Sequence, residues 1–251
     1  MAKVESIRLD QLLVDRDLVE SRHKAQALIL AGQVLVEEQK VDKPGRRVSA
    51  EAAVRFLGLP AKFVSRAGYK LEAALERFSV DLMGTTCLDV GASTGGFTDC
   101  MLQRGAAKVY AVDVGTNQLH WKIRQDPRVE VRERVNARYL GPPDVPEPCD
   151  FACCDVSFIS VTLILPAVVA LLTPSAPMIV LAKPQFEVGR ADVGKGGVVR
   201  DPALRQAAAD RVALSLRELG FRKVEQMESP LAGAEGNREL LLLAAERERV
   251  P

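Results

Sequence analysis

The sequence predicts an α/β protein, in which a doubly wound, Rossmann-like sheet follows a small α+β domain. Two observations support this fold class. From Thr86 onward, apolar strand-like segments alternate with helical patterns, as in a parallel sheet with crossover helices. The first sixty residues instead hold two short helical patterns and then short strands separated by turns. We therefore expect a small domain at residues 1–59, a linker at 60–64 and a larger domain at 65–251.

The small domain begins with two predicted helices. Leu9, Leu12 and Leu13 fall on one face of the first helix. Ser21 is a favourable N-cap for the second, because its side-chain oxygen can accept a hydrogen bond from a free backbone N–H of the first turn. Short alternating strands follow from Val34, and the turn at residues 43–47 is rich in Lys and Arg.

The larger domain is predicted to hold seven strands. A helix at about residues 65–78 precedes them. The segments 178–182 and 240–244 are almost continuously apolar, as strands buried on both faces require. A glycine-rich stretch at residues 184–200 is expected to be irregular and to form a mobile lid over a ligand crevice. The strands are expected near residues 86–91, 108–113, 129–135, 151–156, 178–183, 221–227 and 239–245.

The most informative segment is the turn after the first of these strands. The strand ends with Asp89 and runs into three closely spaced glycines before a helix, the arrangement with which α/β folds receive a nucleoside cofactor. The next strand ends in Asp113, where a carboxylate can accept hydrogen bonds from ribose hydroxyls. The spacing from Gly91 is not the G-x-G-x-x-G of a dinucleotide site, and Asp89 would repel a diphosphate. The turn therefore favours S-adenosylmethionine, with NAD as the alternative.

Composition narrows the class of protein further. The 251 residues are 47% hydrophobic, enough for a packed core, and the net charge of +1 means that a polyanion must be met by a local basic face. The five cysteines lack paired metal-site spacing and the two histidines lie in different segments, so we expect buried, reduced thiols and no metal site. The longest apolar run, residues 161–172, is shorter than the roughly 20 residues of a membrane span. We expect a cytoplasmic protein.

Charged residues mark the ends of three of the predicted strands. Asp155 follows the fourth strand, Lys183 follows the fifth, and Glu239 begins the last. A lysine placed directly after an apolar run needs an acidic partner, and both Asp155 and Glu239 are candidates. A purely structural buried ion pair is the alternative to a catalytic role.

These residues carry a resemblance to a known family. Lys70, Asp155, Lys183 and Glu239 occupy the places of the Lys-Asp-Lys-Glu tetrad of FtsJ-like ribose 2′-O-methyltransferases. Residues 5–58 resemble the small RNA-binding module of the S4-like ribosomal protein class. The chain as a whole resembles the TlyA family, through Ser65-Arg-Ala-Gly-Tyr-Lys-Leu, Asp89-Val-Gly-Ala-Ser-Thr-Gly-Gly-Phe-Thr-Asp, Asp113-Val-Gly, Asn136-Ala-Arg, Asp155-Val-Ser-Phe-Ile-Ser, Lys183-Pro-Gln-Phe-Glu and Gly196-Gly-Val-Val-Arg-Asp-Pro.

The resemblance implies an S-adenosylmethionine-dependent enzyme that methylates a cytidine ribose 2′-hydroxyl in ribosomal RNA. It implies ribosomal RNA or ribosomal subunits as partners, and we expect a monomer that binds no membrane. The tetrad would be catalytic, with Lys183 either a neutral base or a charged group that polarises the hydroxyl. The alternatives are a membrane-active hemolysin, a label that the family has also carried, and a non-catalytic RNA-binding protein.

The resemblance implies two sets of binding residues, and the spacing of the glycine turn and of Asp113 agrees with the first of them. The cofactor set is Asp89, Gly91, Ala92, Ser93, Thr94, Gly95, Gly96 and Phe97 around the methionine end, Asp113 and Val114 at the ribose, Asn136 and Ala137 at the adenine, and Asp155. The RNA-binding set is Arg8, Arg22, Lys24, Arg46, Arg47 and Arg66.

Overall fold

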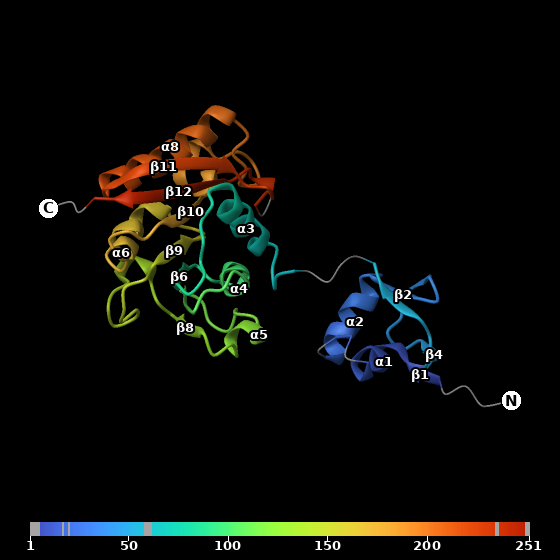
Figure 1. The fold of residues 1–251 in the computed structure, drawn as a ribbon. Coiled ribbons are helices and arrows are strands. Elements are labelled where there is room, and N and C mark those ends of the chain that lie inside the picture. Colours follow the sequence, from blue (N-terminus) through green and yellow to red (C-terminus); the bar gives the residue numbers. More distant parts are fainter. Residues whose placement is uncertain (1–5, 17, 20, 58–61, 234–235, 249–251) are drawn as a thin grey trace. The chain divides into compact units, whose positions relative to one another are not determined.

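The computed structural model describes residues 6–16, 18–19, 21–57, 62–233 and 236–248, in two compact units. The division falls between Lys62 and Phe63. It lies inside the linker expected at residues 60–64, of which residues 60 and 61 are outside the described residues. Figure 1 shows the chain coloured from its N-terminus to its C-terminus.

The smaller unit packs two helices on short antiparallel strands. Its helices are α1 (Leu9–Asp15) and α2 (Arg22–Leu30), and the Ser21 side chain accepts a hydrogen bond from the backbone N–H of Lys24 (3.2 Å), which confirms the predicted N-cap. Leu9, Leu13 and Ile29 are completely buried between the elements. The strands are β1 (Ser6–Arg8) paired with β4 (Arg47–Ser49), and β2 (Val34–Val36) between β3 (Gln39–Val41) and β5 (Val54–Phe56).

The larger unit is built on a seven-stranded sheet of order β11-β12-β10-β9-β6-β7-β8. Six of these strands run in the same direction, and β12 lies antiparallel between β10 and β11. All seven predicted strands are confirmed, within a few residues at their ends. They are β6 (Thr86–Val90), β7 (Lys108–Asp113), β8 (Val129–Glu133), β9 (Phe151–Cys154), β10 (Met178–Ala182), β11 (Phe221–Glu228) and β12 (Leu240–Arg247).

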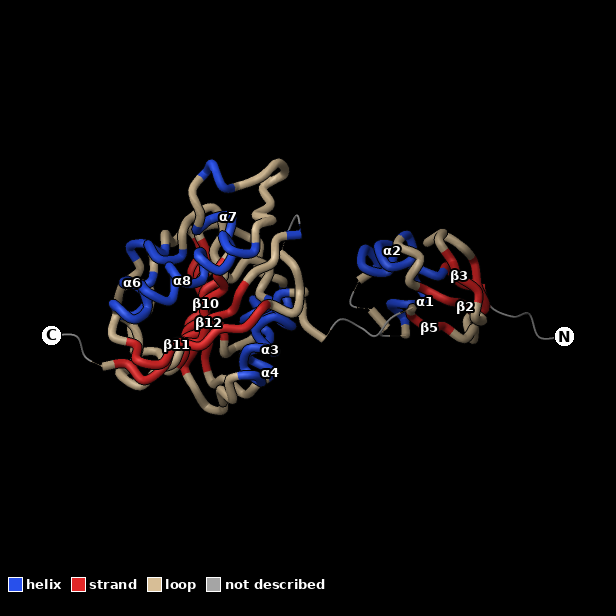
Figure 2. The backbone as a smooth tube through the Cα atoms, turned by 90° about the horizontal axis from the view of Figure 1, so that it is seen from above, coloured by secondary structure: helices blue, strands red, loops and turns tan. Residues whose placement is uncertain are grey.

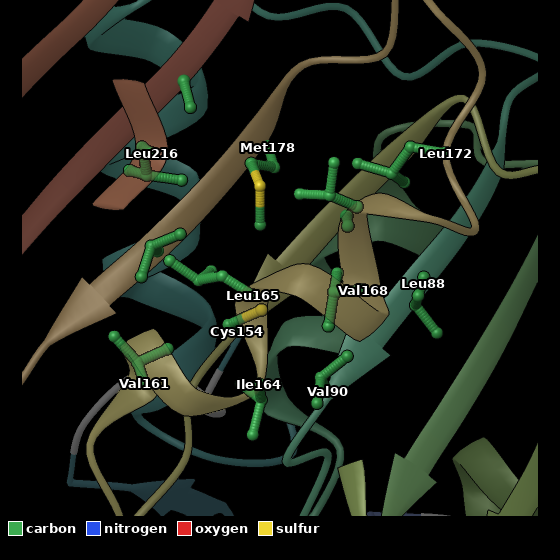
Figure 3. Packing of buried hydrophobic residues seen from close by; sticks show 14 of the residues in the cluster. Leu88, Val90, Cys154, Val161, Ile164, Leu165, Val168, Leu172, Met178 and Leu216 are labelled. Atoms are coloured by element: carbon green, nitrogen blue, oxygen red, sulfur yellow. The ribbon is translucent and has the colours of Figure 1, made fainter. Parts of the chain in front are cut away.

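Helices cover both faces of this sheet, as the doubly wound prediction requires (Figure 2). Alternate residues of β10 enter different cores: Met178 and Val180 face one cluster, and Ile179 and Leu181 face the other. Figure 3 shows the first cluster, where Leu165 and Val168 pack near Met178. On that face lie the 3₁₀ turn η2 (Val161–Leu163), α6 (Leu165–Val169) and α8 (Pro202–Glu218), and on the other α3 (Ala67–Arg77), α4 (Gly96–Gln103) and α5 (Trp121–Arg124).

One local prediction is wrong. The stretch 184–200 was expected to be irregular throughout, but it contains α7 (Pro184–Glu187) and a 3₁₀ turn, η3 (Arg190–Asp192). Pro184 explains the first of these, because proline has its φ fixed near the helical value and needs no donor at the first helical position. The five cysteines are all buried, as expected.

Candidate functional site

A cavity of about 410 Å³ opens at the carboxyl ends of β6, β7 and β9. This is the edge at which parallel α/β sheets bind ligands, and the volume lies in the range of small-molecule sites. Apolar side chains form much of the wall, together with the Asp113 and Asp155 carboxyl groups. Its lining is Val90, Gly91, Ser93, Val112, Asp113, Val114, Gln118, Val135, Asn136, Ala137, Asp155, Val156, Ser157, Phe158, Ile159 and Ile164.

The glycines of the turn after β6 allow chain segments to approach one another. Gly91 has φ +88°, and a Cβ there would collide with the backbone oxygen of Asp155. A Cβ on Gly96 would collide with the Ser65 hydroxyl, just before α3. The glycines therefore bring β6 close to β9, and α4 close to α3, before any ligand is considered.

Backbone donors hold Asp113 at the cavity wall. Its Oδ2 accepts a hydrogen bond from the N–H of Ser93 (2.8 Å), and its Oδ1 accepts one from the N–H of Gly115 (2.7 Å). Asn136 lies farther along the wall, and its Oδ1 accepts a hydrogen bond from the N–H of Arg138 (3.1 Å), which opens the 3₁₀ turn η1 (Ala137–Tyr139). The two backbone N–H groups thus fix the Asp113 carboxylate in place, and its oxygens keep further lone pairs that can accept hydrogen bonds.

Part of the predicted cofactor set lies away from this cavity. Asp89 is completely buried, where it accepts hydrogen bonds from the Thr98 hydroxyl (2.5 Å) and the Cys153 thiol (3.5 Å). Burial raises the pKa of Asp89 to about 7. Phe97 packs in the core, and Ala92 is buried. Gly95 and Gly96 begin α4, and Thr94 follows Ser93 on the turn without lining the cavity.

Sequence reasoning assigned no role to the segment that follows Asp155. Val156, Ser157, Phe158 and Ile159 all line the cavity, and Gln118 does so from the loop after β7. The rule that ligands bind at strand ends could have found the first four, because they follow β9 directly. Phe158 is 93% exposed and has φ +68°, a conformation that is rare for an aromatic residue.

The four charged residues of the predicted tetrad form two ion pairs. The Lys183 Nζ lies 2.6 Å from Asp155 Oδ1 and donates a hydrogen bond to the Ser157 hydroxyl (2.9 Å). Of the two acidic partners considered for Lys183, the structure selects Asp155. Glu239 instead pairs with Lys70 at 2.5 Å, and both of those side chains are buried.

Strand register brings the two pairs to one edge of the sheet. Ala182 of β10 pairs with Leu240 of β12, so Lys183 and Glu239 are the next residues past the end of that antiparallel ladder. Asp155 follows β9, whose Cys154 pairs with Val180 of β10. The sheet therefore places Asp155, Lys183 and Glu239 together beside the cavity that Asp155 lines.

A buried asparagine ties the glycine-rich stretch to this edge. Asn237 is completely buried, and its Oδ1 accepts a hydrogen bond from the N–H of Val199 (3.0 Å) while its Nδ2 donates one to the carbonyl of Gly197 (2.8 Å). Residues 197 and 199 are therefore bonded to Asn237, which precedes Glu239 by two residues in the chain.

The predicted RNA-binding residues are exposed cations, most of them in the smaller unit. Arg8 and Arg22 both donate hydrogen bonds to the buried carboxylate of Asp10, and the hydrogen bond from Arg8 is the main reason why the pKa of Asp10 is held well below its usual range. Arg47 donates to Ser6. Lys24 and Arg46 are exposed, as is Arg66 at the N-cap of α3 in the larger unit.

Over the part of the chain that the structure describes, we find no helix with the length and apolar character needed to cross a membrane.

Two family models match the chain, one in each of the two units. Residues 63–246 match the model described as FtsJ-like methyltransferase, and residues 7–54 match the S4 domain.

Relatives of known name match nearly the whole chain. A Mycobacterium tuberculosis protein named 16S/23S rRNA (cytidine-2'-O)-methyltransferase TlyA is 46% identical over 94% of this chain and 88% of its own length. Hemolysin A of Brachyspira hyodysenteriae is 42% identical over 94% of this chain and 98% of its own length. A solved structure of a candidate hemolysin from Streptococcus thermophilus is 39% identical with a TM-score of 0.72, and it covers 98% of this chain and 90% of its own.

Proposed function

The chain belongs to the FtsJ-like methyltransferase family and carries an S4 domain, and from this membership we propose that it transfers a methyl group from S-adenosylmethionine to a cytidine ribose 2′-hydroxyl in ribosomal RNA. One observation carries the proposal: the Lys183–Asp155 and Lys70–Glu239 pairs meet at the sheet edge beside a cavity of cofactor size. A ribosomal RNA methyltransferase matches 94% of the chain, which supplies the substrate class.

The cavity has the chemistry that S-adenosylmethionine requires. Asp113 offers a fixed carboxylate for ribose hydroxyls, and Val156, Ile159 and Ile164 offer apolar surface for a purine ring. Gly91 and Ser93 would hold the methionine end, and Asn136 and Ala137 the adenine. When bound, this cofactor supplies an already activated methyl group. The protein's task is then to align the hydroxyl and to manage one proton, and alignment can contribute as much as about 7–11 kcal/mol.

Lys183 is the group placed to act on the hydroxyl proton. Its Nζ lies 2.6 Å from Asp155 Oδ1, which fixes the end of the side chain beside the cavity that Asp155 lines. A protonated lysine is a donor only, so it polarises the hydroxyl oxygen and must first lose a proton before it can act as a base. The pH profile of methyl transfer distinguishes these two roles. We propose that Lys70 and Glu239, the second ion pair of the tetrad, hold this edge of the sheet in place beside Lys183.

A protein of net charge +1 needs a local basic face to bind RNA, and we propose that the S4 domain provides it. Phosphate contacts from Arg and Lys position a protein on RNA without reading its sequence. We propose that residues 1–59 bind structured ribosomal RNA through Arg8, Arg22, Lys24, Arg46 and Arg47, that residues 65–251 carry out the reaction, and that Arg66 contacts RNA from the start of α3.

Replacement of Lys183 tests the proposal directly. We expect Lys183→Ala to abolish methyl transfer to ribosomal subunits while calorimetry still detects S-adenosylmethionine binding. Lys223→Ala, which removes an exposed lysine from the edge strand β11 of the same unit, is the matched control and should keep full activity. Methyl transfer by the Lys183→Ala protein would remove this lysine from the mechanism.

Mapping of the product tests the substrate class. Ribosomal RNA from cells with the protein should carry 2′-O-methyl cytidine at positions that are unmodified in cells lacking it. Identical maps would overturn the assignment to ribosomal RNA. Lysis of erythrocytes by the Lys183→Ala protein would instead support the hemolysin alternative.

A further inference from the structure

Another buried carboxylate of the larger unit, that of Glu187, lies outside the tetrad. Glu187 ends α7, four residues after Lys183, and its residue surface is only 3% exposed. Its Oε2 accepts a hydrogen bond from the Ser160 hydroxyl (2.5 Å), and its Oε1 accepts one from the backbone N–H of Val161 (2.7 Å). Burying a carboxylate costs free energy unless it is hydrogen-bonded, so these two donors explain why a glutamate is tolerated here.

The two donors belong to the segment that begins with Asp155. Residues 155–161 and 183–187 therefore touch at three successive places. At one end, Lys183 contacts Asp155 and Ser157. In the middle, the ring centroids of Phe158 and Phe186 lie 5.6 Å apart. At the other end, Glu187 accepts hydrogen bonds from Ser160 and Val161.

Glu187 is also fixed from a second direction. The Arg211 side chain of α8 donates a hydrogen bond to the Glu187 backbone carbonyl (3.0 Å). The end of α7 is thus anchored to a 17-residue helix that packs on the sheet, and the segment 155–161 is tied to that anchor through the carboxylate.

We propose that Glu187 is a positioning residue, which holds the segment after β9 against the segment after β10 so that Lys183 and Asp155 keep their spacing beside the cavity. The inference rests on the proposed methyl transfer and adds to it a residue that touches neither cofactor nor hydroxyl. It also accounts for the positive φ of Phe158, because such a conformation persists only where the surroundings fix the chain on both sides.

The test compares Glu187→Ala, Glu187→Gln and the wild type in methyl transfer to ribosomal subunits. Loss of the carboxylate frees the 155–161 segment, and a displacement of about 1 Å at a reacting group can cost about a hundredfold in rate, so we expect kcat per folded molecule to fall at least about tenfold in Glu187→Ala. The same variant should shift the pH profile of kcat, since the Lys183–Asp155 spacing changes. Glu187→Gln keeps an acceptor for Val161 and should recover most of the rate.

Glu218→Ala is the matched control, because Glu218 is an exposed glutamate at the end of α8. A role in stability alone would lower the folded fraction and leave kcat per folded molecule and the pH profile unchanged, and that result would overturn the proposal. A crystal structure of Glu187→Ala gives a readout independent of activity. If the wild type methylates no ribosomal RNA, the proposed function fails, whereas an unchanged Lys183–Asp155 distance in the variant contradicts the role of Glu187 itself.

Discussion

The two units each bury an aspartate completely, and the two carboxylates meet opposite surroundings. In the smaller unit, Asp10 accepts hydrogen bonds from Arg8, Arg22 and Gln26, and its pKa lies well below the usual range. In the larger unit, Asp89 accepts hydrogen bonds from the Thr98 hydroxyl and the Cys153 thiol, and burial raises its pKa to about 7. Burial alone therefore does not fix the charge of a carboxyl group; the neighbouring cations do.

The two aspartates hold different parts of the molecule in place. Asp10 orients Arg8 and Arg22, two of the arginines expected to contact RNA, because its carboxylate accepts hydrogen bonds from both side chains. Asp89, expected at the methionine end of the cofactor, instead supports the turn from beneath through Thr98 of α4. Glu239 is a third buried carboxylate with different surroundings, because it pairs with Lys70, a cation that is itself buried.

The largest effect is expected from breaking this third pair. Lys70→Met leaves Glu239 buried without its partner and should lower the free energy of unfolding of the larger unit by about 3–5 kcal/mol. Urea unfolding followed by the fluorescence of Trp121, the single tryptophan of the chain, reports on this unit. The double variant Lys70→Met/Glu239→Leu should recover most of the loss. A change of less than about 1 kcal/mol in the single variant would contradict the buried pairing.

The second prediction concerns pH and Asp89. Because its pKa is raised on folding, its favourable contribution to stability is present below the unfolded pKa of about 3.9 and is lost as the pH rises through about 7. At about 1.4 kcal/mol per pKa unit, the loss is about 4 kcal/mol. Asp89→Asn should lack this dependence when Trp121 fluorescence is followed between pH 4 and pH 8. Parallel stability curves for the two proteins would show that Asp89 is not the group responsible.

Asp10 should show the opposite dependence with a smaller effect. Its pKa is lowered on folding, so its contribution is present above the unfolded pKa of about 3.9 and is lost as the pH falls. Asp10→Asn should cost about 1–2 kcal/mol, because the Arg8 and Arg22 side chains are 44% and 49% exposed and water screens them. Amide hydrogen exchange in α1 and α2 measures the loss. The exposed Asp42→Asn is the control, and equal protection in both variants would refute the role of Asp10.

The smallest effect is expected at the start of α2. Ser21→Ala removes the acceptor for the Lys24 N–H and should cost about 1 kcal/mol, again measured by hydrogen exchange in α2. Ser21→Asp keeps the acceptor and adds a negative charge at the helix N-terminus, so it should be at least as stable as the wild type. Loss of protection in Ser21→Asp as well would show that the hydroxyl has another role.

Much of the fold could be predicted because its signals are local. Continuous apolar runs located β10 and β12, and Ser21 located the start of α2. The residues at strand ends were also predictable, because the carboxyl ends of parallel strands meet at one edge of a sheet. Short helices were harder: α7 lies in a glycine-rich stretch, where only Pro184 signalled a helical turn.

The sequence by itself determined the fold class, the seven strands, the glycine turn and the four charged residues of the tetrad, because periodicity and residue order are properties of the chain. Only the tertiary structure decided which lysine pairs with which acid, that Asp89 lies beneath the turn, and that Glu187 reaches Ser160 and Val161. These contacts join residues far apart in the chain, and strand order and register set their distances. The turn at Gly91 illustrates both, since its pattern was visible in the sequence while its closeness to Asp155 comes from the pairing of β6 with β9.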